Sequence, residues 1–155
     1  MSLSPHNPIL CAEIVEMLDI KPADVVIDGT VGFGGHSQAF LEKLSSAGIL
    51  IGLDLDEKAV QYCQDKFEGN KNARIFKSNY IDFPEILSRL KIKTIDRALV
   101  DLGLSSYQID SSERGFTYLK EEVLDMRMNL DSELTAEMVV NEYENDELYK
   151  VFREY

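Results

Sequence analysis

The fold is decided by the stretch Val25-Val26-Ile27-Asp28-Gly29-Thr30-Val31-Gly32-Phe33-Gly34-Gly35-His36-Ser37. Its first three residues are β-branched and apolar, which is typical of a strand that is buried on both faces of a parallel sheet. The glycines that follow allow positive φ angles and a close approach of the backbone to a ligand. A helix that begins near Gly35 would direct its unpaired N–H groups toward this turn. The stretch therefore predicts a strand, a glycine-rich loop and a helix, the arrangement that holds nucleotide-like cofactors in doubly wound α/β folds.

A second apolar strand, expected at 49–54, ends in Asp54, which lies 19 residues after Gly35. A carboxylate at this place meets the ribose hydroxyls of a bound cofactor, and its two oxygens can accept both protons. The glycine spacing is not the dinucleotide fingerprint, because Ser37 stands where G-x-G-x-x-G begun at Gly32 needs its third glycine. The pattern favours S-adenosylmethionine over the NAD of an oxidoreductase. The alternative is that the glycines only form a turn and that Asp54 only caps the next helix.

The length of 155 residues and the 45% hydrophobic content are those of one ordinary globular domain. No apolar run approaches the ~18 residues of a membrane span, and the first residues lack the features of a signal peptide. We therefore expect a cytoplasmic protein without membrane association. Cys11 and Cys63 occur without a CxxC motif or paired histidines, so we expect reduced thiols and no metal site.

The net charge of −12 is unevenly distributed along the chain. Residues 121–155 carry 11 acidic and 3 basic side chains, so the chain as a whole does not have the charge of a nucleic-acid-binding protein. Residues 71–97 carry seven basic side chains against three acidic ones. We interpret them as a solvated surface, with a local basic strip for RNA as the alternative.

Strands and helices alternate four times along the first hundred residues, which predicts a parallel sheet with right-handed crossovers. The carboxyl ends of the strands form the ligand edge of such a sheet. This edge would carry the glycine loop, Asp54, Tyr80 and Asp101. We expect strands at 24–28, 49–54, 73–77 and 95–102, and helices at 8–20, 35–46, 56–68 and 83–90.

The pattern changes after Asp101. Residues 103–128 show neither a helical nor a strand period, but their apolar side chains argue against disorder, so we expect an ordered active-site loop. A helix is expected from Leu134 onward, with a break between Asn141 and Asp146. Four strands are half of a doubly wound sheet, and the exposed edge strand would favour a homodimer.

Five motifs, linked in order and with family-typical spacing, resemble the MraW-type small-subunit ribosomal RNA (cytidine-N4) methyltransferases. They are His6-x-Pro8-Ile9-Leu10, Asp28-Gly29-Thr30-x-Gly32-x-Gly34-Gly35-His36-Ser37, Asp101-Leu102-Gly103-Leu104-Ser105-Ser106-x-Gln108-Ile109-Asp110, Arg114-Gly115-Phe116 and Leu124-Asp125-Met126-Arg127-Met128. The resemblance covers nearly the whole chain. It implies methyl transfer from S-adenosylmethionine to N4 of a cytidine in the RNA of the small ribosomal subunit.

The resemblance also implies an α/β, Rossmann-like class I S-adenosylmethionine-dependent methyltransferase fold, present as a partial parallel sheet with flanking helices. It predicts a cofactor-binding half-domain at 1–110, an active-site loop at 111–133 and the start of an α-helical insertion at 134–155. Family members are about twice as long, so we expect a truncated chain, for which a catalytically inactive cofactor-binding fragment is the alternative function. The residues expected to contact the cofactor are Gly34, Gly35, His36, Asp54, Tyr80, Asp101 and Gln108.

Several of these roles have alternatives. His36 would contact the cofactor or would only cap and pack its helix, and Tyr80 would stack on adenine or pack in the core. Asp101 would bind the cofactor or would accept hydrogen bonds from the substrate amine, and the sequence does not identify the catalytic residue. Arg114 and Arg127 would contact RNA phosphates or form structural salt bridges with Asp110 or Asp125.

Overall fold

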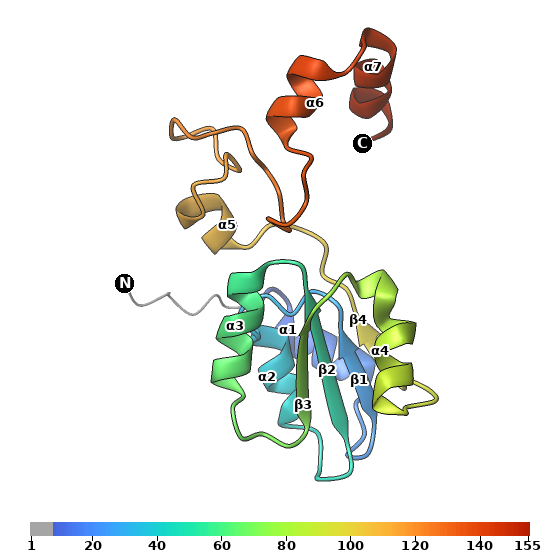
Figure 1. Ribbon diagram of the computed structural model, residues 1–155. Helices are drawn as coiled ribbons and strands as arrows, with labels where there is room; N and C mark the ends of the chain where they lie inside the picture. The colour runs from blue at the N-terminus through green and yellow to red at the C-terminus, as the bar shows by residue number, and fades with distance from the viewer. Residues whose placement is uncertain (1–7) are drawn as a thin grey trace. The chain divides into compact units, whose positions relative to one another are not determined.

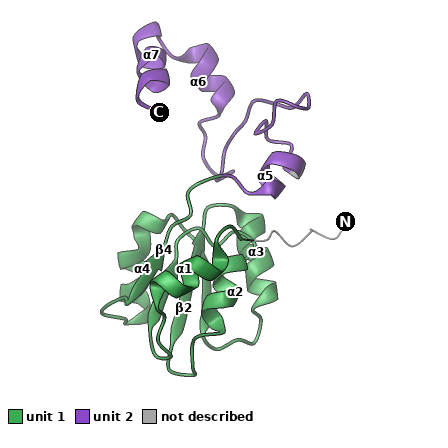
Figure 2. Cartoon of the chain, turned by 180° about the vertical axis from the view of Figure 1, so that it is seen from behind, with its two compact units in different colours: residues 1–103 green, residues 104–155 purple. Residues whose placement is uncertain are grey.

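The computed structural model describes residues 8–155. They divide into two compact units, of which the first ends at Gly103 and the second comprises residues 104–155 (Figure 2). The first unit contains the sheet and the second contains only helices and loops. Each unit is described by itself. Within residues 8–155, no helix is long and apolar enough to cross a membrane.

The first unit is built on a four-stranded parallel sheet with the order β3-β2-β1-β4 (Figure 1). The predicted parallel arrangement is confirmed. The strand β4 is shorter than the predicted 95–102, because the N–H of Asp101 donates to the Thr30 hydroxyl (2.8 Å) in the loop after β1 instead of extending the ladder. The strands are β1 (Val25–Asp28), β2 (Ile49–Asp54), β3 (Ala73–Lys77) and β4 (Arg97–Leu99).

Alternate residues of β2 face opposite sides of the sheet, and both sides are covered. Leu50 packs in a core with residues of α1 and α2, the face seen in Figure 2, whereas Ile51 and Leu53 pack against α4. The helix α3 packs on β3 and β2 through Cys63 and Phe67. The helical elements of this unit are α1 (Cys11–Leu18), α2 (Gly35–Leu41), α3 (Glu57–Lys66), the 3₁₀ turn η1 (Tyr80–Asp82) and α4 (Phe83–Leu90).

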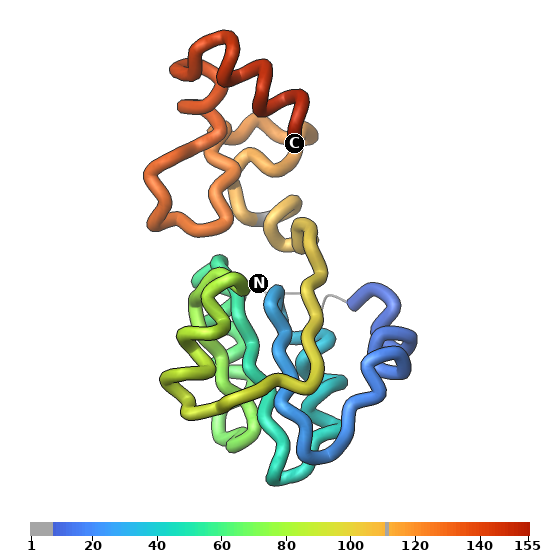
Figure 3. The backbone as a smooth tube through the Cα atoms, turned by 90° about the vertical axis from the view of Figure 1, so that its right-hand side faces the viewer, coloured from blue at the N-terminus to red at the C-terminus, as the bar shows by residue number. Residues whose placement is uncertain are grey.

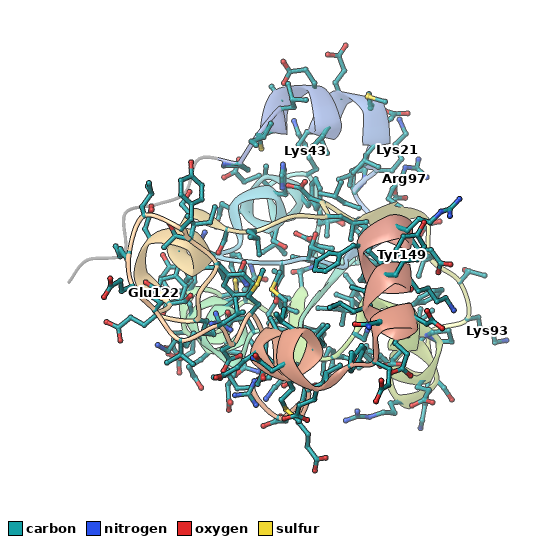
Figure 4. All side chains as sticks on the ribbon, turned by 90° about the horizontal axis from the view of Figure 1, so that it is seen from above. Lys21, Lys43, Lys93, Arg97, Glu122 and Tyr149 are labelled. Atoms are coloured by element: carbon teal, nitrogen blue, oxygen red, sulfur yellow. The ribbon has the colours of Figure 1, made fainter. Side chains whose placement is uncertain are left out.

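The prediction that the first helix begins at Pro8 is wrong, because the helix begins at Cys11, after Leu10 in a left-handed conformation (φ 52°). The predicted cap Asn7 and the motif residue His6 lie outside the described residues. At the other end of α1, the Arg97 guanidinium donates to the carbonyl of Leu18 (Figure 4). This bond joins the end of α1 to the start of β4.

The second unit contains α5 (Ser106–Ser111), α6 (Ala136–Glu142) and α7 (Asn145–Glu154). The predicted break in the last helical region is confirmed. The helix α5 corrects the prediction that residues 103–128 contain no helix. Its start is fixed by a capping box, in which the Ser105 hydroxyl accepts from the Gln108 N–H (3.2 Å) and the Gln108 side chain accepts from the Ser105 N–H (2.8 Å).

No regular element occurs between α5 and α6, and the course of this stretch is drawn in orange in Figure 3. Its hydrogen bonds nevertheless tie it together. The Met126 N–H donates to the Arg114 carbonyl (2.7 Å). Arg114 is 7% exposed, and its guanidinium donates to the carbonyl of Arg127 (2.9 Å). The Arg127 guanidinium forms a two-point contact with Asp125 (2.7 and 2.8 Å). The predicted salt bridge of Arg127 with Asp125 is confirmed, whereas Arg114 holds its unit together through backbone carbonyls instead.

Candidate functional site

The glycine loop leaves β1 at its carboxyl end and enters α2. Gly32 and Gly34 have positive φ angles (49° and 70°), and the Gly34 N–H closes the loop onto the Val31 carbonyl (2.8 Å). A Cβ on Gly34 would lie 3.0 Å from the Cys63 sulfur and from the Phe67 ring. Glycine is therefore required at position 34 both by the backbone conformation and by the approach of α3.

The Asp54 carboxylate lies at the end of β2, beside this loop. One oxygen accepts the Gly32 N–H (2.8 Å) and the other accepts the Asp56 N–H (2.9 Å). The side-chain cap of α3 is Asp56, which accepts the N–H of Lys58 (3.0 Å), so capping does not explain Asp54. The Asp54 carboxylate, which the Leu55 N–H also approaches, keeps lone-pair capacity for a further donor such as a hydroxyl. Burial raises the pKa of Asp54, and the bonds from the Asp56 and Gly32 N–H groups partly oppose this shift.

Asp28 opens the glycine-loop motif, but the sequence reasoning gave it no role of its own in the site. It is 1% exposed, and its carboxylate accepts from the Ser37 hydroxyl (2.7 Å) and the Thr30 N–H (3.3 Å). Burial raises the pKa of Asp28, while these two hydrogen bonds act in the opposite direction. The Asp28 carboxylate therefore links the start of the glycine loop, at Thr30, to the helix that follows it, at Ser37. The signal in the sequence was a serine in the first turn of the helix, facing a carboxylate at the end of the preceding strand.

Gly35 and His36 bind the chain's own N-terminal segment. A Cβ on Gly35 would lie 3.0 Å from the Pro8 ring, and the His36 Nε2 lies 3.0 Å from the Ile9 carbonyl. The His36 ring is 8% exposed and lies nearly parallel to Phe40 at 6.3 Å. These contacts agree with the alternative in which His36 packs against neighbouring residues and does not contact the cofactor. They also place the Pro8–Ile9 segment of the first motif beside the glycine loop.

Tyr80 and Asp101 reach the same edge from β3 and β4. A Cβ on Gly29 would lie 2.9 Å from the Cβ of Tyr80, so the tyrosine sits directly against the start of the glycine loop. Its side chain is 37% exposed, which leaves the ring able to stack on a ligand. Asp101 is exposed and is tied to the loop through the bond from its N–H to Thr30. The first unit thus brings together Gly34, Gly35, His36, Asp54, Tyr80 and Asp101.

Gln108 is the one predicted cofactor residue in the second unit. Its side chain is 7% exposed and is engaged in the capping box of α5, and its amide nitrogen donates to the Met128 sulfur (3.1 Å). The structure accordingly shows Gln108 holding its own unit together.

The second unit has an open hollow of about 620 Å³ that contains none of the predicted cofactor residues. Its lining is mainly acidic, and Glu122 (labelled in Figure 4) accepts the Gly115 N–H (2.9 Å). In the described part of the chain, no group of three or more histidine, cysteine, aspartate or glutamate side chains could hold a metal ion. The lining residues are Asp110, Glu113, Lys120, Glu121, Glu122 and Val123.

Relatives of the chain are found among curated proteins. A protein of Caldicellulosiruptor saccharolyticus is 46% identical over 150 residues, which are 97% of this chain and 49% of the relative. A protein of Mycoplasma mobile is 44% identical over 149 residues, 96% of this chain and 49% of the relative. Both are named ribosomal RNA small subunit methyltransferase H. The chain spans about half the length of the curated relatives it matches.

A solved structure shares the fold. A putative rRNA-methylase from Clostridium thermocellum superposes with a TM-score of 0.53 at 18% sequence identity, over 68% of this chain and 56% of the other. The sheet and its flanking helices form a Rossmann-like methyltransferase fold, as the sequence predicted. The model of the MraW methylase family matches residues 3–155. The chain therefore belongs to the MraW methylase family.

Proposed function

We propose that the first unit binds S-adenosylmethionine at the carboxyl edge of its sheet, and that the protein methylates N4 of a cytidine in small-subunit ribosomal RNA. The names of the relatives support methyl transfer and small-subunit ribosomal RNA as the substrate, and the resemblance of the five motifs supports N4 of a cytidine as the acceptor. The observation that carries the cofactor proposal is Asp54, which is fixed against the glycine loop and keeps lone-pair capacity for a further donor. A partly buried carboxylate with a raised pKa suits hydroxyl donors such as those of a ribose.

Each residue at this edge would contact a different part of the cofactor. Asp54 would accept the ribose hydroxyls, Tyr80 would stack on the adenine, and the backbone at Gly34 and Gly35 would lie along the methionine part. Asp101, exposed beside Thr30, would hold the ammonium of the cofactor or the amine of the substrate. His36 would support the site through its contact with the N-terminal segment.

The bound cofactor supplies an electrophilic methyl group on a sulfonium. The N4 amine of cytosine is a poor nucleophile, because its lone pair is delocalised into the ring. The task of the protein is therefore mainly to place the amine in line with the methyl group. Asp101, where it accepts hydrogen bonds from this amine, would hold N4 in place, and the proton that N4 gives up on methylation would pass to solvent at this exposed edge. A cytidine taken out of its stack would meet this requirement.

Titration calorimetry of the 155-residue chain with S-adenosylmethionine tests the cofactor site. We expect binding in the micromolar range, no binding of NAD, and a loss of more than about tenfold in affinity for Asp54→Ala, since two hydrogen bonds to a charged group are removed. Asp65→Ala, which removes an exposed carboxylate from α3, is the matched control and should bind as the unsubstituted chain does. Equal binding by all three proteins would overturn the role of Asp54.

The catalytically inactive fragment makes a different prediction, namely binding without methyl transfer. The inactive-fragment alternative has weaker support, because the two relatives, which align with 97% and 96% of this chain, are named methyltransferases. Transfer of a labelled methyl group to small ribosomal subunits separates the two. We expect label in N4-methylcytidine, and binding without any label would favour the inactive fragment.

A further inference from the structure

Three consecutive carbonyls of the glycine loop receive donors from a single face of α3. The Cys63 thiol donates to the Gly32 carbonyl (3.2 Å). The Lys66 ammonium donates to the carbonyls of Phe33 (3.2 Å) and Gly34 (3.0 Å). These contacts come from outside the loop's own stretch of sequence, about thirty residues further along the chain.

Apolar contacts extend the same junction. The rings of Phe33 and Tyr62 meet edge to face at 5.1 Å, and Gly34 lies against Cys63 and Phe67. Tyr62, Cys63 and Phe67 have the spacing of one helix face, with Lys66 next to them. The Lys66 ammonium lies 5.3 Å from the centre of the Phe67 ring. We call Tyr62, Cys63, Lys66 and Phe67 the α3 clamp.

We propose that Lys66 is a positioning residue for the cofactor, acting through the glycine loop; this proposal rests on the cofactor site proposed above. A peptide unit is planar, so fixing the carbonyls of Phe33 and Gly34 also fixes the N–H groups of the next residues. The donor matters because the loop contains two glycines with positive φ angles, and glycine has the largest backbone freedom of all residues. Lys66 thereby reduces the number of loop conformations that compete with the binding-competent one.

Lys66 is suited to this role and contributes little to the core. Its side chain is exposed, whereas its neighbours Cys63 and Phe67 are buried. Removing the ammonium should therefore loosen the loop without unfolding the helix or the sheet. A residue that only stabilised the fold would lower the melting temperature and the affinity together.

The test compares Lys66→Met, which keeps the aliphatic stem, with Lys66→Arg, which keeps a charged donor. Lys43→Met, at an exposed lysine after α2 (Figure 4), is the matched control. Amide hydrogen exchange of residues 29–37 is measured in the cofactor-free chain, and the Kd for S-adenosylmethionine is measured by calorimetry. For Lys66→Met we expect about fivefold to tenfold faster exchange and about fivefold to tenfold weaker binding, as for a lost charge-assisted hydrogen bond. The melting temperature should stay within about 2 °C.

Lys66→Arg should recover most of both losses, and Lys43→Met should change neither quantity. Unchanged amide exchange in Lys66→Met would show that Lys66 does not hold the glycine loop, whether or not the chain binds the cofactor. Faster exchange with unchanged affinity would overturn the positioning role. If the unsubstituted chain does not bind S-adenosylmethionine, the proposed cofactor site fails, while the exchange experiment still decides whether Lys66 holds the loop.

Discussion

At the scale of single residues, the site depends on a buried carboxylate. Among residues 8–155, Asp28 accepts hydrogen bonds from Ser37 and Thr30, and burial raises its pKa. Above pH 3.8, the usual aspartate value, the unfolded chain loses a proton that the folded chain retains. The contribution of Asp28 to the free energy of unfolding is therefore greatest below pH 3.8 and falls as the pH rises toward the folded-state pKa.

Asp28→Asn should remove this pH dependence, because the amide cannot ionise. We expect the free energy of unfolding of Asp28→Asn to rise relative to that of the native chain as the pH is raised from 3 to 7. Urea denaturation measures both free energies. Asp65→Asn controls for the loss of one exposed negative charge. A difference between the native chain and Asp28→Asn that does not change with pH would contradict the buried ionisation.

The roles of individual residues were predictable where a side chain acts through its own chemistry, and less so where distant segments meet. The place of Asp54 beside the glycine loop follows from the strand and loop pattern, because parallel strands end at one edge. The contact of His36 with Ile9 could not be read from spacing, since 27 residues separate them and the bond uses a backbone carbonyl. Lys66 was missed for the same reason, because backbone carbonyls leave no signature in the sequence.

At the scale of elements, the alternating pattern predicted the sheet and its helices, because each buried strand is a short apolar run and each helix has an apolar face. The ends were less predictable. Leu10 adopts a left-handed conformation that delays α1, and the tie between Asp101 and Thr30 ends β4 early. The helix α5 carries only a few apolar residues, yet Ser105 and Gln108 form a capping box that its sequence shows.

The chemical reactivity of Cys63 reports on the contact between α3 and the glycine loop. Cys63 is fully buried, and desolvation raises the pKa of its thiol to about 12, so at pH 8 only about one thiol in ten thousand is ionised. We expect iodoacetamide at pH 8 to modify the partly exposed Cys11 at least about a hundredfold faster than Cys63, with both modified after denaturation in urea. Peptide mapping by mass spectrometry measures the two rates.

Lifting α3 from the loop exposes Cys63, so Lys66→Met should increase its rate of modification, whereas the rate at Cys11 in α1 should not change. Equal rates at both cysteines in the native chain would mean that α3 leaves the loop frequently. This outcome would contradict the close packing of Gly34 against Cys63 and Phe67.

At the scale of the whole molecule, the sheet has two edge strands, β3 and β4. The strand β4 is short and begins with the charged Arg97, but Ala98 within it and Val100 just after it are exposed, Val100 by 42%. Leu102, just beyond the strand, is 72% exposed. Unpaired strand groups beside exposed apolar side chains favour pairing with another strand. We propose that this 155-residue chain forms a homodimer by pairing β4 with β4 of a second copy.

Light scattering after size exclusion tests this proposal. A 17.6 kDa chain should elute with about twice that mass, and the dimer fraction should fall on dilution. Ala98→Lys places a charge on the edge strand, as natural proteins do to prevent such pairing, and should shift the mass to that of the monomer. Lys43→Glu, which changes charge away from the edge, should leave the dimer intact. A native chain that is monomeric at all concentrations would refute the edge contact, and its β4 would then be an edge kept single by its short length of three residues.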